Sequence, residues 1–306
     1  MAKALVLGAT GHIGAHVVRA LLAQGHEVRA AYRSEKYLPV LDGLPVERVK
    51  VDLDRPGQLV EALRGREWVF HAAGYYPANR GSREKAVRAG IESARRDLET
   101  IRQAAPARVV FTSSAATIRA VPGQAATEAD AEPWPLTHWR RRYAAVKIAM
   151  EQEALRAAGA GLPVVIVNPS LCIGEYDAHT FSGRSVLAFS RYRFRWYTEI
   201  SFNVVYTGDV GVGHVRAAEM GRVGERYLLA GQNVSLKEFG TFACRELGLP
   251  PPRWKIPYVG AYLGGCLLDG SRAVRELGMP QTPAAEAVRR AVQWFKQHGY
   301  IKERTR

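Results

Sequence analysis

The sequence has few cysteines, and they form no recognisable disulfide or ligand pattern. Among 306 residues there are only Cys172, Cys244 and Cys266, widely spaced and without a CxxC pair or a cysteine–histidine cluster. We therefore expect neither a disulfide framework nor a structural zinc site. Arginine, glycine or glutamate interrupts each apolar run before the roughly 18 residues that a membrane span needs. The apolar stretch at the start is too short for a secretory signal, so a cytoplasmic protein is predicted.

Acidic residues are outnumbered, since 29 aspartates and glutamates face 43 lysines and arginines, for a formal net charge of +14. This balance favours an anionic partner, whether nucleic acid, a membrane surface or a phosphorylated small molecule, although solvated basic faces give the same composition. The densest clusters are residues 140–142 and the alternating Arg191, Arg193 and Arg195, which could clamp a diphosphate or lie on an exposed strand face. Neither resembles a tail that wraps nucleic acid. We expect a small-molecule substrate as partner, with no nucleic acid and no membrane.

Internal repeats with a period of about 20 to 50 residues are absent as well. The first half of the chain instead alternates short apolar runs with helical periodicity. Strands are expected at residues 3–8, 27–32, 45–51, 67–72, 107–113 and 162–168. Helices are expected between them, at residues 12–24, 59–64, 93–105 and 143–158. This rhythm predicts an α/β fold, a doubly wound parallel sheet of the Rossmann type with helices on both faces.

The rhythm changes after Pro169. Residues 170–206 are rich in aromatics and arginine and are expected to form an irregular connection with one strand near residues 202–206. Helices are predicted further on at residues 209–220, 236–247 and 284–297, with a strand at 226–230. We therefore expect a dinucleotide-binding Rossmann domain at residues 1–169 and a smaller α+β substrate-binding lobe at residues 170–306, intertwined with the first.

Three glycines, Gly8, Gly11 and Gly14, stand directly after the first expected strand and at the start of the first helix. There the first glycine permits a tight turn, the second lets the backbone approach a pyrophosphate, and the third lets the helix pack on the strand. The phosphates would lie at the helix N-terminus. The motif predicts a dinucleotide site rather than a purely structural turn. Its contacts are expected from Gly8, Thr10, Gly11, His12, Ile13 and Gly14.

The residues after the second strand bear on which dinucleotide binds. An NAD site usually has an acidic residue there for the ribose 2′-hydroxyl, whereas this chain has Tyr32, then Arg33 and Lys36. Cationic side chains suit a 2′-phosphate, so NADP is predicted in preference to NAD. The alternative is that Arg33 is one of many surface arginines and that NAD also binds. Asp52 and Leu53, at the end of the third strand, either flank the adenine or simply end the strand.

Tyr143 and Lys147 are four residues apart in a helical pattern and so share one helix face. A lysine ammonium near a phenol favours the phenolate and lowers the pKa of the tyrosine from its reference value of about 10. Thr112, Ser113 and Ser114 end the fifth strand, where the carboxyl edge of the sheet overlooks the cofactor crevice. This arrangement predicts proton transfer to or from a hydroxyl beside the dinucleotide.

Several segments together carry a family resemblance. They are GATGHIG at residues 8–14, HAAG at 71–74, FTSSAAT at 111–117, YAAVK at 143–147 and VNPSLCIGEYD at 167–177. With them the chain resembles the extended short-chain dehydrogenase/reductases, and among these the NAD-dependent epimerase/dehydratase family, in its branch of dihydroflavonol reductases and hopanoid-associated sugar epimerases. The resemblance covers nearly the whole chain, including residues 221–233 and the last helix with Trp294.

The resemblance implies roles for three side chains. Ser114, which directly precedes the alanine of its motif, orients and polarises the carbonyl or alkoxide oxygen. Tyr143 exchanges its proton, and Lys147 lowers the pKa of Tyr143 and holds the nicotinamide ribose. Further cofactor contacts are implied for Ala72, Ala73, Thr112, Asn168 and Pro169. Because relatives commonly pair through the helices at residues 90–104 and 143–158, a homodimer is implied as well.

The chain departs from the family pattern at three places, one of them the stretch between Gly265 and Asp269, which lacks residues that relatives use for a helix over the substrate. Gly90 stands where relatives usually have an asparagine, so the side chain that would serve a proton relay or a cofactor contact is missing. Glu175 follows Gly174 where Gly-Pro is usual. Among the histidines, His71 is expected to pack behind the cofactor, and His12 and His16 to have surface or packing roles rather than to bind a metal.

These residues favour an enzyme, an NAD(P)-dependent oxidoreductase that moves hydride between NADP(H) and a ketone or secondary alcohol. The alternative is a nucleotide-sugar epimerase or dehydratase that uses the same step transiently with retained NAD. Tyr32 and Arg33 favour the first hypothesis, and the basic C-terminal lobe favours the second. A non-catalytic NADP-sensing regulator is a third hypothesis, disfavoured by Ser114, Tyr143 and Lys147, since a sensor needs no proton donor.

Overall fold

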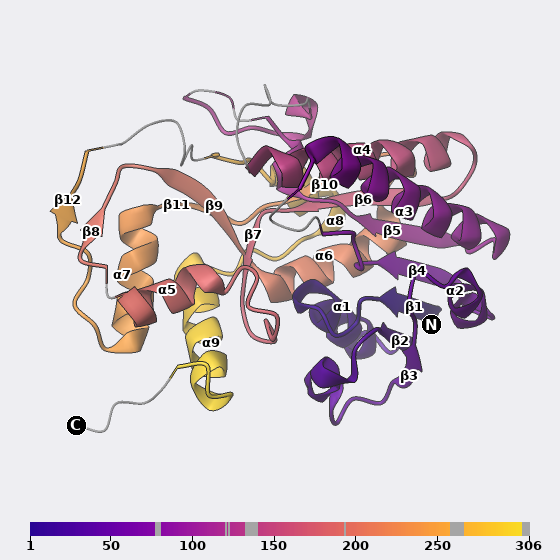
Figure 1. The fold of residues 1–306 in the computed structure, drawn as a ribbon, viewed down its shortest axis with the longest axis horizontal. Helices are drawn as coiled ribbons and strands as arrows, with labels where there is room; N and C mark the ends of the chain where they lie inside the picture. Colours follow the sequence, from indigo (N-terminus) through magenta and orange to yellow (C-terminus); the bar gives the residue numbers. More distant parts are fainter. Residues whose placement is uncertain are drawn as a thin grey trace.

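The computed structural model describes residues 1–76, 81–119, 121, 123–131, 140–192, 194–257 and 266–301. The side chains of Arg140 and Arg141 and the whole of Arg193, all in the predicted basic clusters, lie outside this description. A large sheet with helices on both faces makes up one side of the molecule, and a smaller group of strands and helices lies beside it (Figure 1).

The large sheet has seven strands in the order β10-β6-β5-β4-β1-β2-β3, and each neighbouring pair is parallel. They are β1 (Lys3–Leu7), β2 (Glu27–Tyr32), β3 (Glu47–Lys50), β4 (Trp68–His71), β5 (Arg108–Thr112), β6 (Val164–Pro169) and β10 (Arg226–Leu229). Every residue of β6 is buried, as expected for an inner strand covered on both faces. The predicted doubly wound α/β fold is confirmed.

Two separate cores hold helices against the two faces of this sheet. The helices are α1 (His12–Ala23), α6 (Thr207–Met220) and α8 (Ser271–Leu277) on one face, and α2 (Pro56–Leu63), α3 (Arg83–Gln103) and α4 (Arg140–Gly159) on the other. Successive residues of β1 alternate between the cores, because strand side chains point to opposite faces in turn. Ala4 and Val6 belong to the first core, and Leu5 and Leu7 belong to the second.

The smaller part is built around a three-stranded sheet in the order β11-β9-β7. Its elements are β7 (Leu171–Ile173), α5 (Arg184–Tyr192), β9 (Ser201–Tyr206), β11 (Gln232–Ser235), α7 (Leu236–Leu247) and α9 (Ala284–Gln297). A two-stranded ribbon of β8 (Trp196–Tyr197) and β12 (Trp254–Lys255) stands at its far end (Figure 1). Short 3-10 helices lie in the connections: η1 (Glu35–Leu41), η2 (Ala115–Thr117) and η3 (Glu128–Asp130).

Most predicted elements are confirmed to within a few residues, and two are corrected. α3 begins at Arg83, well before the predicted start at residue 93, because its first turns are mostly polar and give no apolar periodicity. Instead Ser82 caps the helix by accepting a hydrogen bond from the Lys85 amide. The irregular connection predicted for residues 170–206 contains the helix α5, which buries Val186 among others. β10, α6 and α8 return to the large sheet, so the two parts of the chain are intertwined.

Candidate active site

In the glycine loop after β1, the backbone of the loop and the backbone at the start of α1 lie very close together. Gly8 has a φ of +79°, which favours glycine, and its carbonyl accepts a hydrogen bond of 2.9 Å from the Gly11 amide. A Cβ on Gly14 would lie 2.1 Å from the Gly8 oxygen, so only glycine lets α1 begin this close to the loop. α1 has no side-chain cap and no acidic residue in its first turn. Its N-terminus is therefore suited to an anion.

Three other residues of the loop are enclosed. Thr10 is 6% exposed, and Ile13 packs against the core under α1. The His12 side chain is 9% exposed, with Nδ1 4.0 Å from the Asp177 carboxylate and Nε2 buried without a partner among the described residues. Burial lowers the pKa of His12, and Asp177 opposes that shift, so the ring is a neutral group able to serve a ligand.

His16 is one turn further along α1 and does not join His12 in a metal site. Its Nε2 lies 3.1 Å from the carbonyl oxygen of Glu175, and burial lowers its pKa well below the ordinary value. Across the described ranges, no group of three or more His, Cys, Asp or Glu side chains is arranged to hold a metal ion. The two histidines thus connect α1 to the segment after β7.

The carboxyl end of β2 presents positive charge. Tyr32 is partly buried, while Arg33 and Lys36 are exposed. The rings of Tyr37 and His179 are in contact, tilted by 31° with centroids 3.8 Å apart, which places the loop after β7 beside these cations. Burial lowers the pKa of His179, and the charges of Arg33 and Lys36 lower it further against the opposing effect of Asp177.

The ends of β3 and β4 differ in their relation to the glycine loop. A Cβ on Gly8 would lie 3.0 Å from both the Ala72 oxygen and the Ala73 nitrogen, so the residues after β4 touch the loop directly. Asp52, after β3, uses its carboxylate to accept a 3.2 Å hydrogen bond from the Asp54 amide, while Leu53 packs on the core. Asp52 thus organises its own turn.

Tyr143 on α4 meets Ser114 at the carboxyl end of β5. Burial raises the pKa of Tyr143 well above its usual 10, the neighbouring Tyr76 raises it further, and a hydrogen bond with Ser114 acts in the opposite direction. The prediction that Lys147 lowers this pKa is not met: the ammonium lies 6.0 Å from the Tyr143 ring centroid, and burial of the phenol dominates. The predicted proximity of the three side chains is nevertheless present.

Lys147 is enclosed beneath this pair. It is 3% exposed, and its Nζ donates to the Thr112 carbonyl oxygen at 3.4 Å. Gly74 makes room for it, since a Cβ there would lie 2.9 Å from Nζ. Burial lowers the pKa of Lys147 from 10.5 to about 8, although the charge of Glu151 partly restores it.

Glu151, one turn beyond Lys147 on α4, is the centre of a buried hydrogen-bond network that the sequence did not reveal. Its carboxylate accepts from Ser113 Oγ at 2.5 Å, Thr117 Oγ1 at 3.0 Å and Asn168 Nδ2 at 2.7 Å. Arg226 of β10 donates to its other oxygen at 2.9 Å. The network fixes the turn that carries Ser114 and explains why Ser113 faces away from Tyr143.

The remaining predicted cofactor residues have mixed surroundings. The Thr112 hydroxyl lies 2.9 Å from His214 Nε2, whose pKa burial lowers to about 4, so only the carbonyl of Thr112 faces Lys147. The amide oxygen of Asn168 is buried and lacks a partner among the described residues. Pro169 is buried at the end of β6.

Two aromatic side chains beside Tyr143 were missed. The Tyr76 ring stacks on Tyr143 with centroids 5.5 Å apart, and Phe181 lies 4.9 Å from Tyr76. Tyr76 is 50% exposed and Phe181 52% exposed. The position of Tyr76 shortly after β4, at the carboxyl edge of the sheet, is the signal that could have pointed to it.

The departures from the family pattern at Gly90 and Glu175 have local explanations. A Cβ on Gly90 would lie 2.9 Å from Val146 Cγ1, so α3 and α4 pack too closely for an asparagine there without movement. Glu175 accepts a 2.6 Å hydrogen bond from the Tyr206 hydroxyl, to which Arg290 of α9 donates at 2.7 Å. His71 is buried as expected, 3.2 Å from Asp97 on α3.

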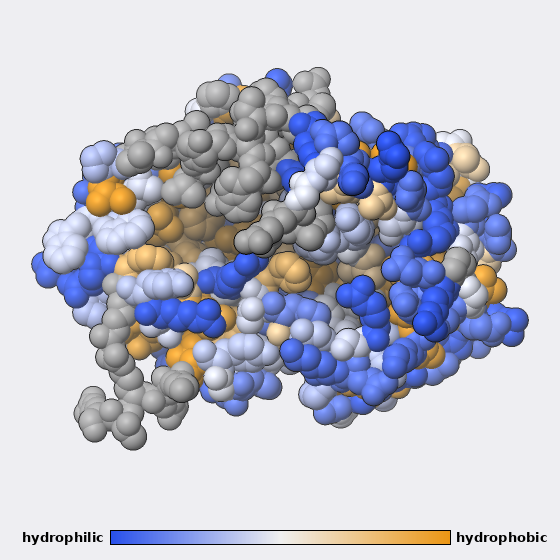
Figure 2. All heavy atoms as spheres, in the orientation of Figure 1, coloured by the Kyte–Doolittle hydropathy of each residue, from blue (hydrophilic) through white to orange (hydrophobic). Residues whose placement is uncertain are grey.

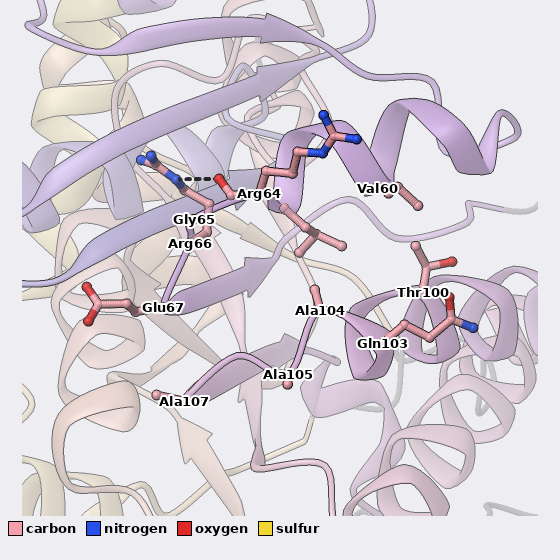
Figure 3. Close-up of a pocket in the computed structure, with 11 residues that line it drawn as sticks. Val60, Arg64, Gly65, Arg66, Glu67, Thr100, Gln103, Ala104, Ala105 and Ala107 are labelled. Atoms are coloured by element: carbon pink, nitrogen blue, oxygen red, sulfur yellow. Dashed lines mark hydrogen bonds between the residues drawn. The ribbon is translucent and has the colours of Figure 1, made fainter.

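A groove of about 570 Å³ lies at the opposite edge of the large sheet (Figure 3). It is bordered by residues at the carboxyl ends of α2 and α3, together with Arg64, Arg66 and Glu67. In the close-up, Arg66 Nε donates to the Arg64 carbonyl at 3.4 Å. Helix carboxyl ends carry partial negative charge, so this groove does not suit a phosphate and is separate from the site described above.

Comparison with known proteins agrees with this geometry. The model of the NAD dependent epimerase/dehydratase family matches residues 4–230, and the chain belongs to this family. A Synechocystis protein that carries the name dihydroflavonol 4-reductase is 34% identical over 97% of this chain and 95% of its own length. Sterol demethylase protein B of Methylococcus capsulatus is 32% identical over 97% and 99%, respectively.

A crystal structure of a nucleoside-diphosphate-sugar epimerase from Pseudomonas aeruginosa is similar at a TM-score of 0.86 and 28% identity, covering 98% of this chain and 99% of that one. The predicted family and enzyme class are thereby confirmed: the protein is an NAD-dependent enzyme of a family with reductases, epimerases and dehydratases. Both the reductase hypothesis and the epimerase alternative fit. No helix in the described part of the chain has the length and apolarity to cross a bilayer.

Proposed function

We propose that this protein is an NADP(H)-dependent reductase that interconverts a ketone and a secondary alcohol. The observation that carries the proposal is the proximity of Tyr143 and Ser114 at the carboxyl end of β5, with Lys147 enclosed beneath them. A proton donor, an oxygen-polarising hydroxyl and a cation are the groups that reduction of a carbonyl needs from the protein.

The residues of the glycine loop fit a dinucleotide. The backbone approach at Gly14 and the uncapped N-terminus of α1 leave no side chain in the way of a pyrophosphate. The Nε2 of His12 and the Oδ1 of Asn168 are buried polar atoms without partners in the described residues, as expected of groups that await a ligand. When bound, the dinucleotide supplies or accepts the hydride.

The chain's own residues would then act on the substrate oxygen. Ser114 would donate a hydrogen bond to it and hold it next to Tyr143. Tyr143 would give its phenolic proton to the oxygen during reduction and take it back during oxidation. Lys147, enclosed beneath Tyr143, would hold the nicotinamide ribose through its ammonium group.

A preference for NADP is supported by the charges after β2. Arg33 and Lys36 are exposed there, and no acidic side chain follows Tyr32 directly. A guanidinium forms charge-assisted hydrogen bonds with a 2′-phosphate, whereas a 2′-hydroxyl gains little from it. NAD is the alternative cofactor in this proposal. Tyr32, Asp52 and Leu53 would lie close to the adenosine of either dinucleotide.

The alternative function is a nucleotide-sugar epimerase or dehydratase that retains NAD. It is favoured by the name of the Pseudomonas aeruginosa neighbour and by basic side chains in the C-terminal lobe, such as Arg290. The two functions differ in whether the nucleotide cofactor remains bound to the purified protein. Denaturing the purified protein and identifying the released nucleotide separates them, since tightly retained NAD favours the epimerase and its absence favours the reductase.

The direct test follows NADPH oxidation with a panel of ring and open-chain ketones, for the wild type and for Tyr143→Phe. We expect the wild type to turn over and the variant to have a turnover rate lower by about 100-fold or more, with little change in NADPH affinity. The control is Tyr192→Phe, which alters an exposed tyrosine on α5, remote from the described site. Turnover of Tyr143→Phe within tenfold, roughly, of the wild type would remove Tyr143 from the mechanism.

We also propose a cytoplasmic homodimer, with residues 1–169 as the dinucleotide-binding domain and residues 170–306 as the substrate-binding lobe. The support is the family's common pairing through the helices that correspond here to α3 and α4, which pack side by side. Light scattering of the purified protein tests the assembly, and a monomeric mass would refute it.

A further inference from the structure

The end of the molecule farthest from the large sheet carries a group of exposed apolar side chains. Tyr192 is 69% exposed, Trp254 64%, Trp196 45% and Ile256 36%. We call these four residues the aromatic tip. They come from the end of α5 and from the ribbon of β8 and β12, at one end of the long axis of the molecule (Figure 1). Single exposed apolar residues are ordinary, but a group of large ones marks an interaction surface.

Strand pairing and ring contacts through Phe194 connect the members of the aromatic tip. Trp196 and Trp254 are cross-strand partners in the parallel ribbon. Phe194 joins the tip to α5, with its ring 5.0 Å from Trp196 and 5.6 Å from Tyr192. Ile256 follows Trp254 by two residues in extended chain and so lies on the same side of it.

The surroundings of the aromatic tip are basic. The described residues of 191–199 and 249–257 include one acid, Glu199, and four bases: Arg191, Arg195, Arg253 and Lys255. Glu199 is neutralised by Lys255 at 2.6 Å. The guanidinium of Arg195 lies 5.7 Å from the Trp254 ring centroid. The tip therefore joins exposed indole rings to an uncompensated positive charge, and the pale and orange residues at the left end of Figure 2 lie among blue ones.

Three kinds of partner could cover such a surface, and its shape and charge distinguish them. A second copy of the chain in a two-fold dimer would bring the same basic side chains face to face, which is repulsive. Single-stranded nucleic acid is held in basic grooves, whereas this surface is the projecting end of the molecule (Figure 1). Tryptophan and tyrosine prefer the headgroup level of a bilayer, and arginine and lysine attract anionic lipids.

We propose that the aromatic tip docks on an anionic lipid bilayer, with Trp196 and Trp254 entering the headgroup region and Arg191 and Arg253 binding the lipid phosphates. This proposal departs from the sequence-based expectation of no membrane partner, and it goes beyond the proposed reaction. It requires no spanning helix, because amphipathic surfaces bind peripherally through apolar burial and charge together.

The test is co-sedimentation of the purified protein with vesicles of phosphatidylcholine alone and of phosphatidylcholine mixed with phosphatidylglycerol. We expect binding to the mixed vesicles, weakened by salt, and little binding to the neutral ones. The double variant Trp196→Ser/Trp254→Ser should lose about tenfold or more in vesicle affinity. Charge reversal by Arg191→Glu/Arg253→Glu, with the rings kept, should abolish the preference for phosphatidylglycerol.

A matched control removes two exposed apolar side chains elsewhere. Met220, the last residue of α6, and Val223, which precedes β10, are 47% and 46% exposed, and Met220→Ser/Val223→Ser should bind vesicles like the wild type. Thermal unfolding of each variant verifies that it is folded. Equal binding of the wild type and the tryptophan double variant, or no binding of the wild type to mixed vesicles, would overturn the proposal. Neither result depends on which ketone or sugar the enzyme uses.

Discussion

Ser113 donates a 2.5 Å hydrogen bond to the buried carboxylate of Glu151, while the adjacent Ser114 lies beside the phenol of Tyr143. In the sequence the two serines are indistinguishable except by their place in a family motif. In the structure the extended backbone of Ser114, at φ −164° and ψ 149°, turns neighbouring side chains in opposite directions. The Ser113 hydroxyl is bound to Glu151, whereas the Ser114 hydroxyl caps η2 by accepting a 3.1 Å hydrogen bond from the Ala116 amide and lies beside Tyr143.

This difference predicts opposite outcomes for two alanine variants. Ser114→Ala should lower kcat by about 10²- to 10³-fold, because one donor to the developing oxyanion is lost. Ser113→Ala should keep kcat within about tenfold and lower the free energy of unfolding by about 1 kcal/mol, because Glu151 keeps its other donors. Steady-state kinetics and thermal unfolding of both variants measure the two effects. If only Ser113→Ala showed a large loss of kcat, the catalytic serine would be Ser113, and the role proposed for Ser114 would be wrong.

A second prediction concerns the glycine loop. Gly14→Ala places a Cβ 2.1 Å from the Gly8 oxygen. The backbone can remove this steric clash only if α1 moves away from the loop. We expect a loss of about 1 to 3 kcal/mol in the free energy of unfolding and a strong loss of NADP affinity. Gly57→Ala is the matched control, since a Cβ there meets nothing within 4 Å. It should be neutral or slightly stabilising. Equal NADP affinity of the two variants would contradict the proposed role of α1's N-terminus.

Much of the fold could be predicted because its determinants are local. The bounds of α7 and α9 follow from apolar periodicity, and the inner strands from their short apolar runs. The return of β10 to the large sheet could not be predicted in the same way. Its partner β6 ends at Pro169, and β10 begins only at Arg226, so nothing within either segment specifies the pairing.

The candidate site shows the same division. Tyr143, Lys147 and Ser114 were predicted from spacing and from the family motif, which preserve position along the chain. The stack of Tyr76 on Tyr143 and the donors to Glu151 depend on which side chains the fold brings together from distant segments. The pKa of Tyr143 was misjudged for a related reason: spacing reveals a nearby charge, but burial, which dominates here, appears only in three dimensions.

A third prediction tests the cofactor preference. Arg33→Ala should weaken binding of NADP by an amount on the order of 1 to 3 kcal/mol and change that of NAD much less, because only NADP carries the 2′-phosphate. Arg64→Ala, at the opposite edge of the sheet, should leave both affinities unchanged. Fluorescence titration with each dinucleotide gives the ratio. Equal weakening of NADP and NAD by Arg33→Ala would refute the assignment.

The last prediction follows from the titration of Lys147. Burial lowers its pKa to about 8 in the protein without dinucleotide, so its charge is present below pH 8 and is lost as the pH rises further. If the ammonium holds the nicotinamide ribose, the bound form keeps the proton and its pKa is raised. Binding then takes up a proton above about pH 8, and NADP affinity should fall by up to about tenfold for each further pH unit, while remaining flat below.

Two variants separate the charge from the side chain. Lys147→Arg stays charged in this range, so its NADP affinity should be independent of pH through 8 and 9. Lys147→Met keeps the apolar stem, so its affinity should be weaker and equally flat. Calorimetric titration of NADP at several pH values, in buffers of different ionisation enthalpy, measures both affinity and proton uptake. If Lys147→Met keeps the pH dependence of the wild type, another group titrates there, and Lys147 does not hold the ribose through its charge.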